Sequence, residues 1–130
     1  MNTDIVTEKI IGCAYTVSNT LGVGFLEKVY ENALLIELEK HGLKTKNQKA
    51  LSVFYAGQIV GEYVADLIVE EKVVVELKAV KSFEPIHQAQ LLNYLKATGI
   101  HTGLLLNFGT SRLGIKRMVL GNKLATDEHR

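Results

Sequence analysis

The stretch ADLIVEEKVVVELK, residues 65–78, decides the fold of this 130-residue chain. Its two aliphatic runs predict neighbouring strands, and the charged triplet at 70–72 predicts the hairpin loop between them. Counting back along the ladder from that loop sets Asp66 directly opposite Glu76. Two carboxylates therefore fall on one face of a strand pair that is otherwise apolar.

Facing carboxylates are destabilising across a strand pair, and desolvation adds to their cost unless a positive charge lies between them. A divalent cation would supply that charge, and Mg²⁺ prefers hard oxygen ligands. Lys78 points the same way as Glu76, while Leu77 points into the opposite layer. The pattern favours metal-assisted hydrolysis of a phosphodiester. The alternative is a solvated Glu–Lys ion pair on an exposed sheet face.

Composition limits the class of protein. With 47% hydrophobic and 22% charged residues, we expect one compact domain over residues 1–120 and a polar tail over 121–130. The net charge of +1 gives no global basic field, so any nucleic-acid contact must be local. Cys13 is the only cysteine, which excludes an intramolecular disulfide and a cysteine-based zinc cluster. No signal-like segment and no apolar run of ~20 residues is visible, which predicts a cytoplasmic protein with no membrane contact.

Hydrophobic periodicity predicts three helices and five strands. Apolar residues at spacings of three and four mark the first helix through Val6, Ile10, Cys13, Ala14 and Val17, and the second through Leu26, Val29, Tyr30, Ala33 and Leu34. The predicted helices span residues 3–20, 25–41 and 84–98, and the predicted strands span 49–55, 59–69, 73–80, 100–108 and 115–120. This order is typical of an α+β fold with three layers, α/β/α. Its mixed sheet would hold an antiparallel three-stranded meander, and the strand after the third helix would join it in parallel.

Four motifs now lie in a recognisable order. Asp66, the triplet Glu76-Leu77-Lys78 and the run Gln90-Leu91-Leu92-Asn93-Tyr94 on the following helix together resemble the PD-(D/E)XK nuclease superfamily. The Gln-x-x-x-Tyr element resembles its RecB-like branch. The stretch GFLEKVY at 24–30 is similar to the signature of the small GxxExxY protein family. Ala65 stands where the superfamily name places a proline, at a position where proline would remove a ladder hydrogen bond.

This resemblance implies a restriction-endonuclease-like core and a metal-dependent nuclease. Asp66 and Glu76 would bind the metal, with the backbone carbonyl of Leu77 as a further ligand. Glu27 would reach the metal from its helix, directly or through water. Lys78 would assist the attacking water or the transition state. The implied cofactor is Mg²⁺ or Mn²⁺.

Four residues are candidates for positioning the substrate. The resemblance implies this role for Gln90 and Tyr94, and the GxxExxY signature adds Tyr30. Arg112 lies near the end of a predicted strand, where a phosphate contact would position nucleic acid without reading its sequence. Such a residue is more often a solubilising surface side chain.

Three functional hypotheses follow from these observations. We favour a Mg²⁺- or Mn²⁺-dependent nuclease acting on DNA or RNA. The alternative is a non-catalytic module that binds nucleic acid or a protein on the same scaffold. The third is a structural or regulatory oligomer whose carboxylates form an ion-pair network. The apolar fraction and a mean hydropathy of +0.11 also predict a homodimer.

Overall fold

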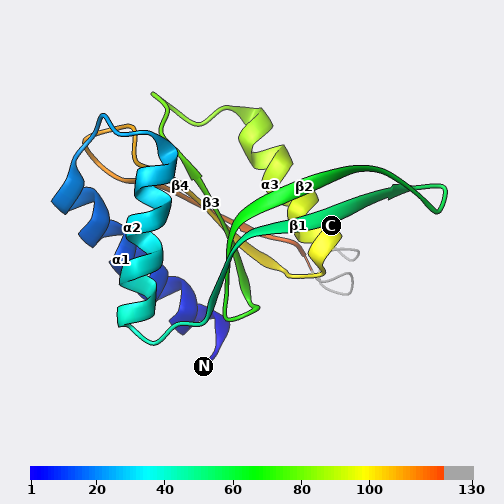
Figure 1. Ribbon diagram of the computed structural model, residues 1–130, viewed down its shortest axis with the longest axis horizontal. Helices are drawn as coiled ribbons and strands as arrows, with labels where there is room; N and C mark the ends of the chain where they lie inside the picture. The colour runs from blue at the N-terminus through cyan, green and yellow to red at the C-terminus, as the bar shows by residue number, and fades with distance from the viewer. Residues whose placement is uncertain (122–130) are drawn as a thin grey trace.

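A five-stranded mixed sheet with helices on both faces organises residues 1–121, which the computed structural model describes (Figure 1). The elements are α1 (Thr3–Leu21), α2 (Glu27–Lys40), β1 (Thr45–Tyr55), β2 (Gln58–Val69), β3 (Val73–Lys78), α3 (Pro85–Thr98), β4 (Thr102–Asn107) and β5 (Gly114–Val119). The strand order is β1-β2-β3-β4-β5. All neighbours are antiparallel except β3 and β4, which α3 connects in parallel. The predicted α+β class and the antiparallel meander are confirmed; residues 122–130 of the predicted tail lie outside the described residues.

Helices α1 and α2 cover one face of the sheet. The N-cap of α1 is Asn2, whose side-chain oxygen accepts the Ile5 N–H at 2.9 Å, satisfying one orphan donor of the first turn. The predicted stripe of α1 is buried and packs with α2 against inward residues of the central strands; its members are Val6, Ile10, Cys13, Ala14 and Val17. This layer holds α2 against the sheet at the level of β3.

Helix α3 covers the opposite face. It begins at Pro85, where the missing N–H is tolerated, and ends at Gly99, which adopts a left-handed φ of 75°. Its buried residues include Leu91 and Tyr94, which pack on the other side of the same strands. The helix is the crossover between β3 and β4, and it follows the loop after Lys78, the last residue of β3.

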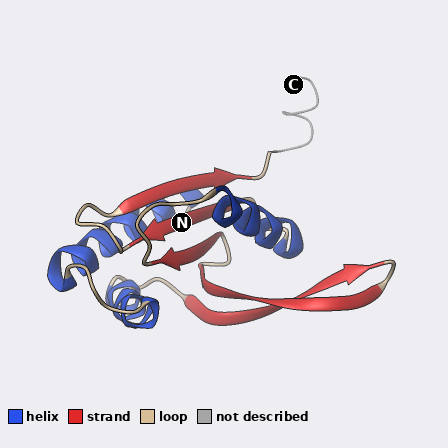
Figure 2. Cartoon of the chain, turned by 90° about the horizontal axis from the view of Figure 1, so that it is seen from above, coloured by secondary structure: helices blue, strands red, loops and turns tan. Residues whose placement is uncertain are grey.

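The β1–β2 hairpin extends beyond the rest of the sheet, and Figures 1 and 2 show its outer half projecting from the body of the molecule. The side chains of Phe54 and Tyr55 near its turn are 63% and 76% exposed. Strand β1 begins at Thr45, four residues before the predicted start. The polar run at 46–49 hid this part of the strand, because most of its side chains face solvent and carry no apolar alternation.

The buried stripe of α2 differs from the predicted one. Leu26 is the N-cap residue and is 81% exposed, and Val29 is also exposed, so both were wrongly assigned to the core. The side chains that α2 buries are Tyr30, Glu31, Leu34 and Leu38. A carboxylate therefore lies within the buried arc of this helix. No helix in the described range is long and apolar enough to cross a membrane.

Candidate active site

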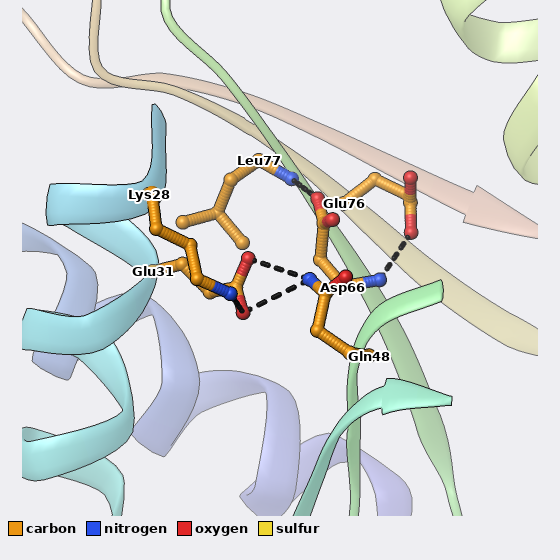
Figure 3. Close-up of polar contacts among 6 residues, drawn as sticks. All are labelled: Lys28, Glu31, Gln48, Asp66, Glu76 and Leu77. Atoms are coloured by element: carbon orange, nitrogen blue, oxygen red, sulfur yellow. Dashed lines mark hydrogen bonds and ion pairs between the residues drawn. The ribbon is translucent and has the colours of Figure 1, made fainter. Parts of the chain in front are cut away.

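Asp66 and Glu76 meet where β2 and β3 diverge. The ladder runs from Val69–Val73 to Leu67–Val75, and continuing this register brings Asp66 opposite Glu76, as predicted. At this row the carboxylates replace the backbone ladder. The Asp66 N–H donates to Glu76 Oε2 at 2.9 Å, and the Leu77 N–H donates to Asp66 Oδ2 at 2.8 Å (Figure 3). Each strand thus holds the carboxylate of the other.

The carboxylate pair lies in an environment that opposes its charge. Glu76 is 6% exposed; desolvation, reinforced by the charge of Asp66, raises its pKa to about 8. Desolvation also raises the pKa of Asp66, and the charges of Glu31 and Glu27 act in the same direction. Within residues 1–121, neither carboxylate has an ion-pair partner. The alternative of a solvated ion pair on an exposed face is therefore wrong.

This donor set fits a hydrated divalent cation. One oxygen of each carboxylate accepts a backbone N–H, and the second oxygen of each has no hydrogen-bond donor among the described residues. Two free carboxylate oxygens with raised proton affinity, one on the buried Glu76 and one on the half-buried Asp66, are suited to a hard cation. No group of three or more His, Cys, Asp or Glu side chains within residues 1–121 is arranged to hold a metal ion. Water or substrate oxygens would have to complete the coordination, as is usual for Mg²⁺.

Lys78 is the positive charge nearest in sequence to this pair. It is half-buried at the end of β3, and its charge lowers the pKa of both Asp66 and Glu76. The backbone around it is held firmly: the Lys78 carbonyl accepts the Phe108 N–H at 2.8 Å. Its ladder partner on β4 is Asn107. The end of β3 therefore presents the ammonium group from a fixed backbone position.

Asn107 fixes the chain just beyond Lys78 and was not predicted from the sequence. Its side chain is buried; Oδ1 accepts the Val80 N–H at 3.0 Å, and Nδ2 donates to the Val80 carbonyl at 2.9 Å. Gly109 packs against the same peptide so closely that a Cβ there would lie 2.4 Å from the Val80 nitrogen. Polar and steric contacts from the β4 end thus hold the segment that follows the catalytic candidates.

The carboxylate that α2 buries beside the site is Glu31, which was not predicted as a site residue. Glu27 is exposed at the first position of α2, although its charge acts on both Asp66 and Glu76. Glu31, one turn further on, is 4% exposed and raises the pKa of Asp66 more than Glu27 does. The sequence carries a signal for it, because Glu31 shares the helical spacing of the buried Leu34 and Leu38. Two carboxylates of α2 therefore contribute negative charge to the site.

Gln48 occupies the β1 position of the same row. The β1–β2 ladder pairs Asn47 with Leu67 and Lys49 with Ala65, so Gln48 lies opposite Asp66 without being a ladder pair. Its φ is 53°, a left-handed value that costs a non-glycine residue about 1–3 kcal/mol. The sequence did not predict a role for this residue, because a left-handed residue inside a strand does not change the hydrophobic periodicity.

The four candidates for positioning the substrate separate in the structure. The Tyr94 hydroxyl lies 3.5 Å from the Val64 carbonyl. Desolvation raises its pKa to about 12, and the charges of Glu76 and Asp66 act in the same direction. Gln90 is half-buried one turn earlier on α3. Arg112 is exposed in the loop between β4 and β5, and no contact within the described residues connects its side chain to the carboxylates.

Tyr30 has a structural role, which corrects the prediction that it positions substrate. It is 0% exposed, and its hydroxyl donates to the Gly22 carbonyl at 2.6 Å. Its ring stacks on Phe108 with centroids 4.8 Å apart. The tyrosine of the GxxExxY signature thus fixes the turn between α1 and α2 and packs it on the end of β4.

Comparison with known proteins gives the same fold. The solved structure titled "Crystal structure of SSO0001" superposes with a TM-score of 0.58 and 19% identity, over 76% of this chain and 52% of that chain. This chain thus matches about half of the other, and an identity this low shows a shared fold alone. No curated protein matches the chain.

A sequence model described as the PD-(D/E)XK nuclease superfamily matches residues 4–118, a range that runs from the first turn of α1 into β5. The five-stranded mixed sheet with its flanking helices is consistent with the restriction-endonuclease-like core of that superfamily. Its nucleases act on nucleic acid and generally use divalent metals. The chain belongs to the PD-(D/E)XK nuclease superfamily.

Proposed function

We propose that this protein is a nuclease that requires Mg²⁺ or Mn²⁺ and hydrolyses phosphodiester bonds of DNA or RNA. Membership of the superfamily supports a nuclease-like activity on nucleic acid. The observation that carries the proposal is the pair formed by the half-buried Asp66 and the buried Glu76, which has one free oxygen on each carboxylate and feels the positive charge of Lys78. Two carboxylates without a counter-charge destabilise the fold, and a bound cation would offset this cost.

Asp66 and Glu76 would hold the cation, with the Leu77 carbonyl as a further ligand and Glu27 contributing directly or through water. A bound divalent cation supplies polarisation of a phosphoryl oxygen and a lowered pKa of bound water. The protein's own contribution is to fix the two carboxylates through backbone N–H donors, so that they need no reorganisation when substrate arrives. The pairing of β2 with β3 sets the distance between the carboxylates of Asp66 and Glu76.

Lys78 would act on the phosphate and on the attacking water. Its ammonium group carries three donors on a flexible stem and offsets negative charge that develops on a phosphate in the transition state. Its backbone is fixed by Asn107 at the end of β4 and by Phe108, the next residue, so the stem would start from a fixed point at the end of β3. A substitution of Lys78 would therefore lower kcat more than it changes nucleic-acid affinity.

Nucleic acid would lie between α3 and the projecting hairpin. A surface hollow there is lined by Phe54, Tyr63, Asn93 and Lys96 among others. Tyr63 contacts Tyr94 edge to face at a centroid distance of 4.7 Å, which connects this hollow to the carboxylate pair. Aromatic faces stack on bases and lysines neutralise phosphates. We include Gln90 and Tyr94 as the residues of α3 that position the strand, and Arg112 as a phosphate contact.

Further parts of the proposal rest on the sequence. We assign the chain to the GxxExxY family and the RecB-like branch, on the motifs at 24–30 and 90–94. We propose one nuclease-like domain over residues 1–120, a cytoplasmic location and a homodimer. The apolar side chains near the hairpin turn, including Ile59 and Val60, are a surface that a dimer would bury. Equilibrium sedimentation at micromolar concentration tests the dimer, and a monomer would contradict it.

The test of the nuclease proposal compares matched variants on plasmid and on single- and double-stranded oligonucleotides. We expect cleavage by the wild-type protein with Mg²⁺ or Mn²⁺ and none with EDTA. Glu76→Gln and Lys78→Met remove cleavage, whereas Lys81→Met, which changes an exposed lysine of the following loop, retains it. Absence of metal-dependent product from the wild-type protein, or equal product from the Lys78 and Lys81 variants, would refute the proposal.

The second candidate is a module that binds nucleic acid or a protein without cutting. It is favoured by the finding that no three acidic, histidine or cysteine side chains of residues 1–121 are arranged to hold a metal. Under this alternative, nucleic-acid binding persists in EDTA and in Glu76→Gln, and no product forms under any condition. Binding measured by fluorescence anisotropy beside the cleavage assay separates the two candidates.

A further inference from the structure

Gln48 combines a strained backbone with a precise side-chain contact. It lies inside β1 with a φ of 53° and is left out of the β1–β2 ladder, whereas the other non-glycine residues with positive φ, Ala56, Glu70 and Glu71, lie in the two hairpin turns. A turn explains those three. A left-handed residue inside a strand requires another explanation, because such strain persists only when its surroundings hold it and is often found at functional sites.

The side chain of Gln48 holds a buried carboxylate. Its Nε2 lies 2.9 Å from Glu31 Oε1 and 3.0 Å from Glu31 Oε2, so the amide spans both oxygens. Lys28 Nζ contacts Oε2 at 3.1 Å. Figure 3 shows Glu31 reaching from α2 toward Gln48, with Asp66 beside them. The side chain of this left-handed residue thus holds Glu31, the carboxylate of α2 that is buried and whose charge raises the pKa of Asp66.

The residues that face α3 change phase at the row of Gln48. Ile68 of β2 packs under α3, and the next residues of that strand to do so are Ala65 and Tyr63. The interval of three between Ile68 and Ala65 breaks the period of two, and it spans Asp66, the residue opposite Gln48. Both strands therefore change phase at this row. Gln48 is released from the β1–β2 ladder and directs its amide to the α2 side of the sheet.

We propose that Gln48 is a positioning residue of the nuclease site, and that it fixes Glu31 as an additional carboxylate acting on the cation through water. This inference rests on the proposed function. Because no third acidic side chain within residues 1–121 is arranged to complete a metal site with Asp66 and Glu76, Glu31 acts beyond the directly bound ligands. In this role Glu31 would accept a hydrogen bond from a water molecule held by the cation, and its charge would add to the negative charge at Asp66. Partners of this kind typically change metal affinity or activity by about 10- to 100-fold.

A purely structural role for Gln48 makes a different prediction. If its left-handed φ were only a local irregularity of β1, glycine would serve equally well, because glycine adopts positive φ without steric cost. Gln48→Gly therefore separates the two roles: it keeps the backbone and removes the amide. Gln48→Asn is the second variant. It tolerates the left-handed region and keeps an amide, but its stem is one methylene shorter and does not reach Glu31.

The experiment measures Mn²⁺ binding to the purified protein by isothermal titration calorimetry, without nucleic acid. We expect Gln48→Gly, Gln48→Asn and Glu31→Gln each to weaken Mn²⁺ binding about 10-fold, with cooperative thermal unfolding retained. The double variant Glu31→Gln with Gln48→Gly should bind no more weakly than Glu31→Gln alone, because both changes remove one interaction. Ala56→Gly, which relieves the same backbone strain in the hairpin turn, is the matched control and leaves Mn²⁺ affinity unchanged.

Cleavage kinetics give a second measurement on the same variants. With saturating oligonucleotide, Gln48→Gly should lower kcat about 10-fold and leave KM within about twofold. Unchanged Mn²⁺ affinity in both Gln48 variants, additive effects in the double variant, or an equal effect of Ala56→Gly would overturn the inference. So would a wild-type protein that binds no Mn²⁺. Mn²⁺ binding that couples Gln48 to Glu31 in a protein that cuts no substrate would instead refute the nuclease proposal and leave the positioning role of Gln48 standing.

Discussion

Replacing the buried Glu76 by glutamine removes one charge from the carboxylate pair while keeping an acceptor for the Asp66 N–H, which Glu76 Oε2 accepts at 2.9 Å. Glutamine has nearly the same shape as glutamate, so packing around β3 is retained. The substitution therefore isolates the electrostatic cost of the pair. We predict that Glu76→Gln stabilises the metal-free protein at alkaline pH and abolishes its nuclease activity.

The magnitude follows from the pKa of Glu76. Burial raises this pKa from 4.5 to about 8, so the folded state binds the proton more tightly than the unfolded state. Stability consequently falls as pH rises from about 4.5 to about 8, and the loss is complete above that window. At ~1.36 kcal/mol for each tenfold change in proton affinity, the loss is at most about 5 kcal/mol. Relaxation of the two carboxylates lowers it, so we expect Glu76→Gln to gain about 2–5 kcal/mol above about pH 8.

Urea unfolding in EDTA, followed by circular dichroism from acidic to alkaline pH, measures this difference. Subtracting the wild-type free energy of unfolding from that of the variant at each pH cancels the titrating groups that do not interact with Glu76, so the difference reports the coupled pair of Asp66 and Glu76. Glu62→Gln, which changes an exposed carboxylate on β2, is the control and should follow the wild type throughout. Saturating Mn²⁺ should restore the wild-type protein and leave Glu76→Gln unaffected. A Glu76→Gln protein less stable than the wild type above about pH 8, or a difference that does not change with pH, would refute the reasoning.

Three further predictions concern the framework and the substrate surface. Gly109→Ala places a Cβ 2.4 Å from the Val80 nitrogen and should destabilise the fold by about 1–3 kcal/mol. Gly12→Ala in α1, where nothing lies within 4 Å, should instead stabilise it by up to ~1 kcal/mol. Shifts of the urea midpoint in the same direction for both variants would contradict this. Tyr30→Phe should lose about 1 kcal/mol of stability and keep wild-type kcat in the oligonucleotide assay, so a large fall in kcat would restore its predicted role in positioning substrate. Lys96→Gln should weaken oligonucleotide binding in Ca²⁺ and reduce the slope of log affinity against log salt by about 1; an unchanged slope would place the nucleic acid elsewhere.

The sequence was sufficient to predict the parts of the fold that depend on apolar periodicity and turn chemistry. The loop at 70–72 set the register that brings Asp66 opposite Glu76, because a hairpin loop of known length fixes every row behind it. The stripe of α1 and the parallel connection through α3 followed from spacing and from the handedness of crossovers. These predictions succeeded because burial and pairing agree with the local sequence at those positions.

Prediction failed where tertiary contacts overrule the local pattern. Leu26 and Val29 have the spacing of core residues, yet the N-cap at Leu26 and the rotation set by Tyr30 leave them exposed. Glu31 took their place in the buried arc because Gln48 and Lys28 satisfy its carboxylate. A buried charge of this kind depends on partners distant in sequence, so a window of neighbouring residues does not reveal it.

The position of the candidate site follows from a shortage of backbone hydrogen bonds. Where β2 and β3 diverge beyond Leu67 and Val75, the N–H groups of Asp66 and Leu77 lose their ladder acceptors, and a buried N–H without an acceptor costs about 1–3 kcal/mol. A carboxylate with two oxygens can satisfy one N–H and still keep an oxygen for a cation. An apolar side chain in place of Asp66 or Glu76 would remove the repulsion between the two carboxylates. It would also leave the N–H of Leu77 or of Asp66 without an acceptor, so part of the stability gained would be lost again. Asp66 and Glu76 therefore have two roles: their side chains accept the N–H groups that the β2–β3 ladder leaves free, and they supply the negative charge that a cation requires. This double role accounts for the position of the candidate site at this row of the sheet.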